Sequence, residues 1–275
     1  MGLKISFTPG RRSRISALVV AAGLLSACAG APSSNGINDP FETTNRKIHA
    51  FNKGVDRVLV SPASKGYGGI VPEPVKRAVG NVAETLDLPG DIANNLLQLK
   101  LADAAQNTLR LGVNLTFGLA GTLDVSSELG LPAKPTDFGA TLHRWGVGEG
   151  PYMELPLAGP STARDTVGMA VDLALNPVRL ALPKREANAA TLLKLFSRLG
   201  DRDRFSGTVD SLLYESADSY AQARLLYLQN RRFQLGQGGA GAEGASDGDF
   251  IDPYADAPSD TAIDDGFIDP YEDSQ

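Results

Sequence analysis

The sequence has few of the residues from which disulfides, metal sites and catalytic pairs are usually built. Its 275 residues include one cysteine and two histidines, His49 and His143. A single cysteine excludes an intramolecular disulfide, so the fold has to rely on packing. Two histidines leave little material for a histidine-based zinc site or a serine–histidine pair. No stretch of the chain has a catalytic pattern, so we predict a protein that is not an enzyme and has no cofactor or metal.

An excess of basic residues is also missing. The net charge is −6, of which the first 27 residues carry +4 and the residues from Gly236 onward carry −11, so residues 28–235 are nearly neutral at about +1. Nucleic-acid binding requires a clustered basic face. We therefore expect no nucleic-acid partner.

Long apolar runs are absent as well. The longest, from Ile15 to Leu25, follows four basic residues between Lys4 and Arg14. It is too short to cross a bilayer core, which needs roughly 20 helical residues. A basic start followed by a short apolar run is typical of a signal peptide.

The one cysteine follows this run directly. Leu25-Ser26-Ala27-Cys28 resembles a bacterial lipobox, in which the cysteine sulfur receives a diacylglycerol. This pattern predicts a lipoprotein signal peptide over residues 1–27 and a lipid-modified N-terminal Cys28, held firmly because two or more acyl chains enter the bilayer. An ordinary signal peptide with a leftover thiol is the alternative. Ala29 stands where inner-membrane lipoproteins often carry Asp, so known sorting behaviour implies the outer membrane, facing the periplasm.

Residues 28–38 are small and polar and read as a flexible tether. Asp39-Pro40-Phe41-Glu42 then has the pattern of a helix start with a capping box. Apolar residues from Phe41 to Leu59 fall on one helical stripe, opposite basic residues. This amphipathic helix either packs on a protein core or lies in the lipid headgroup region.

The remaining periodic segments predict a mainly helical chain without an α/β sheet. Asp87, Asp91, Asp201 and Asp203 read as caps or loop charges rather than as a hydrolytic pair. The expected helices are Pro74–Leu86, Asp91–Leu99, Asp103–Ala120, Ser161–Asn176, Ala187–Leu199, Thr208–Tyr214 and Asp218–Leu235.

The helix expected over Asp103–Ala120 is apolar on one side but contains Asn107, Arg110 and Asn114. Those groups would lack partners in hydrocarbon, so it is not a free-standing transmembrane segment. Its glycines suit close helix packing near lipid.

After Leu235 the composition changes to that of a disordered linker, and we predict a disordered acidic tail over residues 236–275. Phe250–Tyr254 reads FIDPY, and the same five residues recur at Phe267–Tyr271. The repeat is either a pair of docking motifs for a basic partner surface or a solvated tail duplicated by chance.

Four motifs in order carry a family resemblance. They are DPFETTNRKIHAFN at Asp39–Asn52, VPEPVKRAVGNVAE at Val71–Glu84, TDFGATLHRWGVGEGPYMELPLAGPSTARD at Thr136–Asp165, and SADSYAQARLLYLQNRRF at Ser216–Phe233. Together with the lipobox they resemble the MlaA (VacJ-like) lipoproteins, outer-membrane components that maintain lipid asymmetry.

The resemblance implies a specific fold and function for residues 39–235, the helical lipid-transport domain. The fold would be all-α, a ring-like bundle of amphipathic helices embedded in one membrane leaflet. Its amphipathic channel would remove mislocalised phospholipids from the outer leaflet and pass them to a periplasmic carrier protein. The resemblance also implies a trimeric porin as partner.

We expect the residues that handle lipid or face the membrane to include Asn45, Phe51 and Asn52, which the family motif contains. Trp145 and Tyr152 join them as aromatic side chains with a polar tip, which favour a polar–apolar boundary, although core packing would explain both equally well.

Two other functions stay open at this point. The chain could be a structural envelope lipoprotein that scaffolds porins or cell wall through its tail, or a periplasmic lipid hydrolase, for which a nucleophile arrangement is missing.

Overall fold

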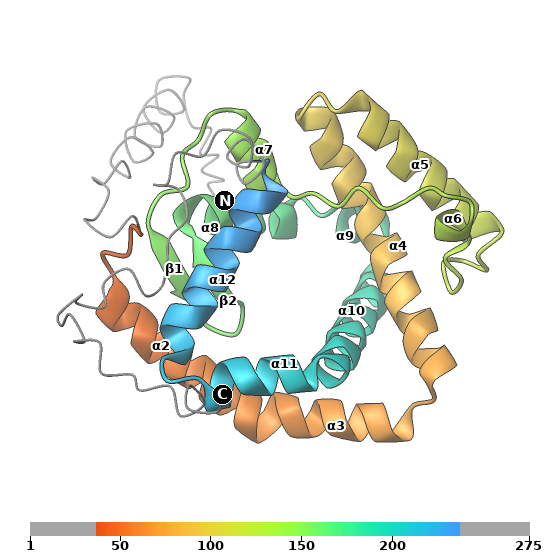
Figure 1. The fold of residues 1–275 in the computed structure, drawn as a ribbon. Coiled ribbons are helices and arrows are strands. Elements are labelled where there is room, and N and C mark those ends of the chain that lie inside the picture. Colours follow the sequence, from red (N-terminus) through yellow and green to blue (C-terminus); the bar gives the residue numbers. More distant parts are fainter. Residues whose placement is uncertain (1–36, 237–275) are drawn as a thin grey trace, which may run out of the picture.

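A closed ring of helices forms the described part of the protein, residues 37–236 of a computed structural model (Figure 1). The predicted signal peptide, Cys28 and the FIDPY repeats lie outside the described residues.

The first half of the ring contains α2 (Glu42–Val55), the π-helix η1 (Asp56–Val60), α3 (Ser61–Ile70), α4 (Glu73–Leu97), α5 (Leu101–Thr116), α6 (Val125–Glu128) and α7 (Phe138–Arg144). The second half contains β1 (Tyr152–Leu155), β2 (Gly159–Thr162), α8 (Ala163–Ala174), α9 (Pro177–Ala181), α10 (Lys184–Arg204), α11 (Ser206–Asp210), the π-helix η2 (Ser211–Glu215) and α12 (Ser219–Gln234).

Contacts between elements close the ring without a gap. The continuous segment α2–η1–α3 packs on α10, α10 packs on α4, and α4 contacts α7. Helix α7 packs on α8, α8 contacts β2, and β1 of the same hairpin returns to α2. Helix α5 lies outside this circuit, against α4 (Figure 1). The prediction of an all-α ring is confirmed, with the two-stranded antiparallel hairpin β1–β2 as an addition.

The side chains buried between the elements are mostly polar, which reverses the usual arrangement. Helix α5 illustrates it: its buried positions are Ala104, Asn107, Arg110 and Asn114. On its outer side Leu109 is 55% exposed, as are other leucines of the same helix to similar degrees. Among the described residues, buried polar side chains outnumber buried apolar ones, and several of the apolar ones are alanines. Hydrogen bonds and ion pairs, more than an apolar core, must therefore hold the elements together.

The start of α2 differs from the prediction. The helix begins at Glu42, its N-cap is Phe41, and no side chain caps it. Asp39 does not cap this helix, because its carboxylate accepts hydrogen bonds from the side chains of Asn45, Tyr220 and Arg224 instead. These long-range partners outweigh the local capping pattern.

Helix α4 also differs, because the two helices predicted on either side of Pro89 are one. A proline inside a helix costs about 3 kcal/mol, so the sequence favours a break there. Polar contacts beyond Pro89 hold the second half in helical form: Asp91 accepts from the Thr136 backbone N–H, and Asn94 donates to Asp172. The expectation that Asp87 and Asp91 are caps or loop charges is therefore wrong, since both lie inside α4.

The other boundaries shift by a few residues. The helix expected over Ser161–Asn176 begins two residues later, because Ser161 lies in β2 and Thr162 caps α8 by accepting from the Asp165 N–H. The predicted segment Thr208–Tyr214 divides into α11 and η2, and the segment Ala187–Leu199 extends to the full length of α10. Asp218 caps α12.

Two glycines allow α7 and α8 to touch. A Cβ on Gly168 would lie 2.3 Å from the backbone nitrogen of Gly139, so no larger side chain fits. The two helices thereby bring Asp137, the N-cap of α7, close to Asp165 in the first turn of α8.

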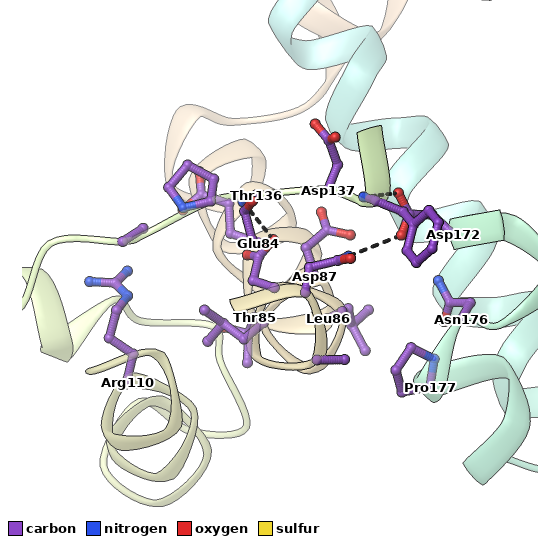
Figure 2. Close-up of a pocket in the computed structure, with 18 of the residues that line it drawn as sticks. Glu84, Thr85, Leu86, Asp87, Arg110, Thr136, Asp137, Asp172, Asn176 and Pro177 are labelled. Carbon is purple, nitrogen blue, oxygen red and sulfur yellow. Dashed lines mark hydrogen bonds between the residues drawn. The ribbon is translucent and has the colours of Figure 1, made fainter. Parts of the chain in front are cut away.

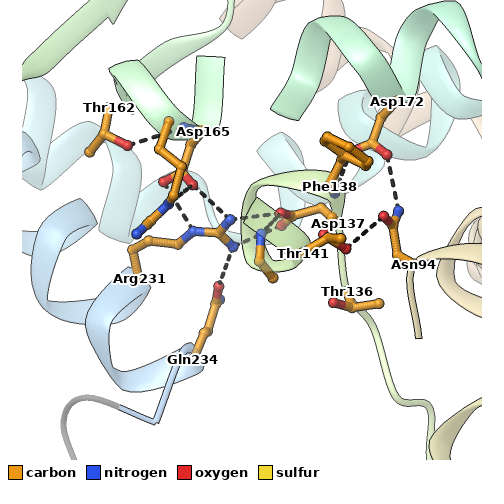
Figure 3. A network of polar contacts seen from close by, with 12 residues as sticks. Asn94, Thr136, Asp137, Phe138, Thr141, Thr162, Asp165, Asp172, Arg231 and Gln234 are labelled. Atoms are coloured by element: carbon orange, nitrogen blue, oxygen red, sulfur yellow. Dashed lines mark hydrogen bonds and ion pairs between the residues drawn. The ribbon is translucent and has the colours of Figure 1, made fainter. Parts of the chain in front are cut away.

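Arg231 of α12 joins these two carboxylates (Figure 3). Its Nη1 and Nη2 donate to Asp137 at 2.7 Å, and its Nε and Nη2 donate to Asp165 at 3.1 and 2.9 Å. Tyr227 donates to the same carboxylate of Asp165 at 2.7 Å. Burial alone would raise the pKa of Asp165, but the hydrogen bonds and charge of Arg231 outweigh it and hold the pKa at about 2. One guanidinium group thus fastens three helices.

We predict that Arg231→Gln destabilises the purified protein by roughly 3–5 kcal/mol, because it leaves Asp137 without an ion-pair partner in the described residues and leaves the buried Asp165 with Arg164 alone. In the described part of the chain the neighbouring Arg232 pairs with the partly exposed Glu149 alone, so Arg232→Gln should cost about 1 kcal/mol or less. Denaturant unfolding in mild detergent measures both variants. Equal losses would contradict the assigned role of Arg231.

Candidate functional site

Two cavities lie side by side within the ring. One has a volume of about 750 Å³ and is lined by α4, α5, α8, α9 and the segment 133–138. The other has a volume of about 1020 Å³ and lies between α4, α8, α9 and α10. We call them the first and second cavity. Figure 2 shows side chains of α4 facing Asp172 and Asn176 across the first cavity.

The residues that line both cavities define the border between them. All of them are polar, and they come from α4, α8, α10 and the residue before α9: Asn81, Glu84, Asp87, Asp172, Asn176 and Arg198. Away from this polar border the walls are partly apolar. Leu97, Phe138 and Leu175 line the first cavity, and Met169 and Leu195 line the second.

Such walls can accommodate a ligand with a charged part and an apolar part. A charged group needs polar partners when it leaves water, whereas an apolar chain gains from contact with apolar side chains. Both conditions are met within neighbouring cavities.

Two carboxyl groups that line the first cavity have raised pKa values. Burial raises the pKa of Asp91 to about 7, although the hydrogen bond from the Thr136 N–H acts in the opposite direction. Burial also raises the pKa of Glu84, and the nearby Asp124 carboxylate adds to this effect. Burial thus favours the neutral form of both groups, and a cation that entered the cavity would stabilise their charged form.

These cavity residues were missed at the level of the sequence, although a signal was present. Glu84, Asp87, Asp91 and Asn94 are spaced by three or four residues, which places them on one face of a helix. A polar stripe on an otherwise apolar helix indicates a polar cavity as well as a solvated surface. The proline at position 89 concealed the continuity of the stripe.

Asn45 and Asn52, predicted from the family motif, hold α2 to the edge of β1. Asn45 accepts from the Glu154 N–H at 3.0 Å and donates to the Tyr152 carbonyl at 3.2 Å. Asn52 accepts from the Leu157 N–H at 2.8 Å and donates to the Leu155 carbonyl at 2.9 Å. Each amide group thus completes the backbone hydrogen bonds of an edge strand, and the seven-residue spacing puts both on one face of α2.

The three predicted aromatic residues lie in different surroundings. Tyr152 is 1% exposed, packs beside Tyr220 and donates to Glu154. Phe51 and Trp145 are each 55% exposed. The Trp145 indole N–H donates to the Leu97 carbonyl at 3.2 Å, so its polar tip is bonded to protein and its ring stays open. A direct role of these residues in lipid handling stays a prediction.

Large apolar side chains cover much of the outside of the ring. Ile70, Leu99 and Phe117 are the most exposed examples together with Val58. Within residues 37–236 no helix has both the length and the hydropathy needed to traverse a bilayer. The same residues contain no cluster of three side chains suited to bind a metal ion.

An apolar outer surface around adjoining cavities with mixed walls defines a class: a helical ring suited to amphipathic ligands. A sequence profile described as "MlaA lipoprotein" matches residues 37–234. The chain belongs to the MlaA lipoprotein family.

Individual relatives agree with this assignment. The Escherichia coli "Intermembrane phospholipid transport system lipoprotein MlaA" is 32% identical over 226 residues, which cover 80% of this chain and 88% of that protein. An uncharacterised Rickettsia felis protein is 33% identical over 189 residues, which cover 68% of this chain and 74% of that one.

A solved structure is also similar, with a TM-score of 0.61 and 27% sequence identity, covering 72% of this chain and 98% of that chain. It is described by the words "Structural basis for maintenance of bacterial outer membrane lipid asymmetry".

We predict that Asp91→Asn stabilises the protein at pH 8 by roughly 1–2 kcal/mol, after allowance for partial solvent screening. Asp91 has a pKa of about 7 when folded against an ordinary value of 3.8, so the folded state holds its proton between these pH values. The burial penalty of the charged form is therefore small near pH 4 and full above pH 7. Asn keeps the oxygen that accepts from Thr136 but carries no charge.

Urea unfolding of the detergent-solubilised protein at pH 4 and pH 8 measures this effect. Glu215→Gln, which removes an exposed carboxylate outside both cavities, is the control. A gain for Asp91→Asn that has the same size at both pH values would show that burial of its charge is not the cause.

Proposed function

We propose that this chain is an outer-membrane lipoprotein of intermembrane phospholipid transport. It removes mislocalised phospholipids from the outer leaflet through the ring and passes them toward the periplasm, which maintains lipid asymmetry. The observation that carries the proposal is the polar border between two partly apolar cavities inside a ring whose outside is apolar. The names of the relatives, with their reference to phospholipid transport and lipid asymmetry, support it.

The apolar outside supports a position within one leaflet of the membrane. Exposed leucines and phenylalanines gain free energy by leaving water, at about 25 cal/mol for each Å² buried. A ring in one leaflet gives a lipid headgroup a polar route and leaves the acyl chains in apolar surroundings. A lipid at Cys28 and the tether of residues 28–38 would keep the body of residues 39–235 at the membrane, on its periplasmic face.

The transfer that we propose breaks no covalent bond, so the protein acts as a conduit and not as an enzyme. A trimeric porin beside the ring and a soluble periplasmic carrier that accepts the lipid complete the proposal. The alternative of an envelope scaffold is not favoured, because the named relatives are transport lipoproteins.

The channel itself can be tested by filling it. Gly80 lines the second cavity, and a Cβ added there meets no atom within 4 Å. We expect Gly80→Phe to fold normally and to obstruct lipid passage. Cells that carry only this variant should accumulate phospholipid in the outer leaflet and become sensitive to detergent, as cells without the protein should.

Gly112→Phe is the matched control. Its Cβ also meets nothing within 4 Å, but Gly112 is exposed on α5 and lines neither cavity. Labelling of outer-leaflet amines with a membrane-impermeant reagent gives the readout, and immunoblots verify equal protein levels. Normal surface lipid in Gly80→Phe cells would contradict the proposed path.

Membrane contact of the outer surface has a separate test. In a Cys28→Ser background the predicted anchor is removed, so vesicle binding then depends on the apolar helices. Leu109→Glu should weaken this binding by about tenfold or more, because a charge placed in hydrocarbon costs on the order of 2 kcal/mol. Gln222→Glu, at an exposed and already polar position, should change it little. Flotation with phospholipid vesicles distinguishes the two variants, and equal binding would argue against a membrane-facing α5.

A further inference from the structure

The border between the cavities contains an exposed arginine, Arg198. Arg198 of α10 lines both cavities, and among the described residues it has neither an ion pair nor a hydrogen bond from its side chain. Arginine binds phosphate oxygens well, because its planar guanidinium group can donate two parallel hydrogen bonds. An open guanidinium group beside partly apolar walls is therefore available to the phosphate of a lipid.

The carboxylates around this arginine exceed the cations of the first cavity. Its lining contains six carboxylates, Glu84, Asp87, Asp91, Asp124, Asp137 and Asp172, against the guanidinium groups of Arg110 and Arg198.

Partners within the protein neutralise only half of these carboxylates. Asp124 is paired with Arg110, Asp137 with Arg231, and Asp87 with Lys194.

Within residues 37–236 the other three carboxylates have no cationic partner. There Asp91 accepts a single hydrogen bond, from a backbone N–H, and Asp172 accepts from the Asn94 side chain and the Phe138 N–H. Glu84 has no hydrogen bond or ion pair within the described part of the chain. Of the three, Glu84 and Asp172 lie on the border together with Arg198.

We infer that this border recognises the headgroup of a zwitterionic aminophospholipid, with the phosphate on Arg198 and the ammonium group near the carboxylates of Glu84 and Asp172 on the border and of Asp91 beside it in the first cavity. This inference rests on the proposed function and adds to it the class of lipid that passes most readily. Such a headgroup carries a negative phosphate and a positive ammonium group, and the cavity wall offers a positive guanidinium group and negative carboxylates.

The same wall disfavours anionic headgroups. Phosphatidylglycerol offers a phosphate to Arg198 but no cation, so the three uncompensated carboxylates would stay unpaired and would repel its charge. The apolar side chains beyond the border, such as Leu97 and Met169, favour a lipid over a water-soluble compound with the same headgroup. The expected ligand is therefore phosphatidylethanolamine or a lipid with a similar amine.

The test uses the full-length lipidated protein, purified in mild detergent and equilibrated with micelles that contain equal amounts of phosphatidylethanolamine and phosphatidylglycerol with identical acyl chains. Mass spectrometry of the bound lipid gives the ratio. We expect phosphatidylethanolamine to be enriched by about tenfold, which corresponds to roughly 1.4 kcal/mol. Glycerophosphoethanolamine, which has the headgroup without acyl chains, should not compete at the same concentration.

Two sets of variants assign the charges. Glu84→Gln combined with Asp91→Asn should remove most of the preference while total bound lipid is maintained. Arg198→Gln should lower the binding of both lipids. Glu186→Gln and Arg185→Gln, exposed positions of α10 outside both cavities, should leave the ratio and the amount unchanged.

The outcomes separate this inference from the proposed function. If the wild-type protein binds both lipids in the ratio of the micelles, or if Glu84→Gln with Asp91→Asn keeps the preference, the headgroup inference is wrong although lipid binding stands. If the wild-type protein binds no lipid, the proposed function itself fails. Competition by glycerophosphoethanolamine would show that the site binds the headgroup without acyl chains and would overturn the assignment to a lipid.

Discussion

The structure depends on polar groups that are buried between helices. A ring with an apolar outside and open cavities inside has little room for an apolar core, and the largest apolar cluster in the described residues consists of Tyr152, Tyr220 and Leu228 with two partly buried neighbours. A hydrogen bond to a charged group contributes about 1.5–3 kcal/mol to stability. Leaving a buried charge unpaired destabilises a protein far more than a typical surface substitution does. The contacts that close the ring are therefore expected to be hydrogen bonds and ion pairs between its elements.

These polar contacts occur where consecutive parts of the ring join. Arg231 fastens α12 to α7 and α8 (Figure 3). Arg202 of α10 binds Asp56 at the beginning of η1 and Asp210 at the end of α11. Asn45 and Asn52 hold α2 to the hairpin. Each contact is directional, so it fixes the relative positions of helices more strictly than apolar packing would. A fixed ring in turn keeps the cavity walls apart.

Much of the fold follows from sequence patterns. Helical periodicity located nearly all of the long helices, the single cysteine excluded an intramolecular disulfide, and two histidines left little material for a histidine-based site. The family motifs led to the ring and to the MlaA lipoprotein family. Failures occurred where distant residues decide local structure. Asp39 does not cap α2 because Asn45, Tyr220 and Arg224 bind its carboxylate, and α4 continues through Pro89 because its second half is held by Thr136 and Asp172.

The candidate site was less predictable than the fold. The sequence drew attention to conspicuous residues of the motifs, among which Asn45 and Asn52 bond to the backbone of the hairpin and Tyr152 packs in the small core. Glu84, Asp172 and Arg198, which form the border of the cavities, belong to three different helices. No spacing within one helix can reveal that they share a wall, although the stripe of Glu84, Asp87 and Asp91 on α4 indicated one side of it.

The amino-acid sequence by itself determined which segments are helical and that each helix has an apolar and a polar face, because these properties arise from the order of side chains along a 3.6-residue turn. Only the tertiary structure decided which face points inward. In water the apolar face would be buried, whereas in this ring the polar faces bond to one another and the apolar faces lie outside. That choice depends on the partners that each buried polar group finds at a distance along the chain, and such partners exist only once the ring has closed.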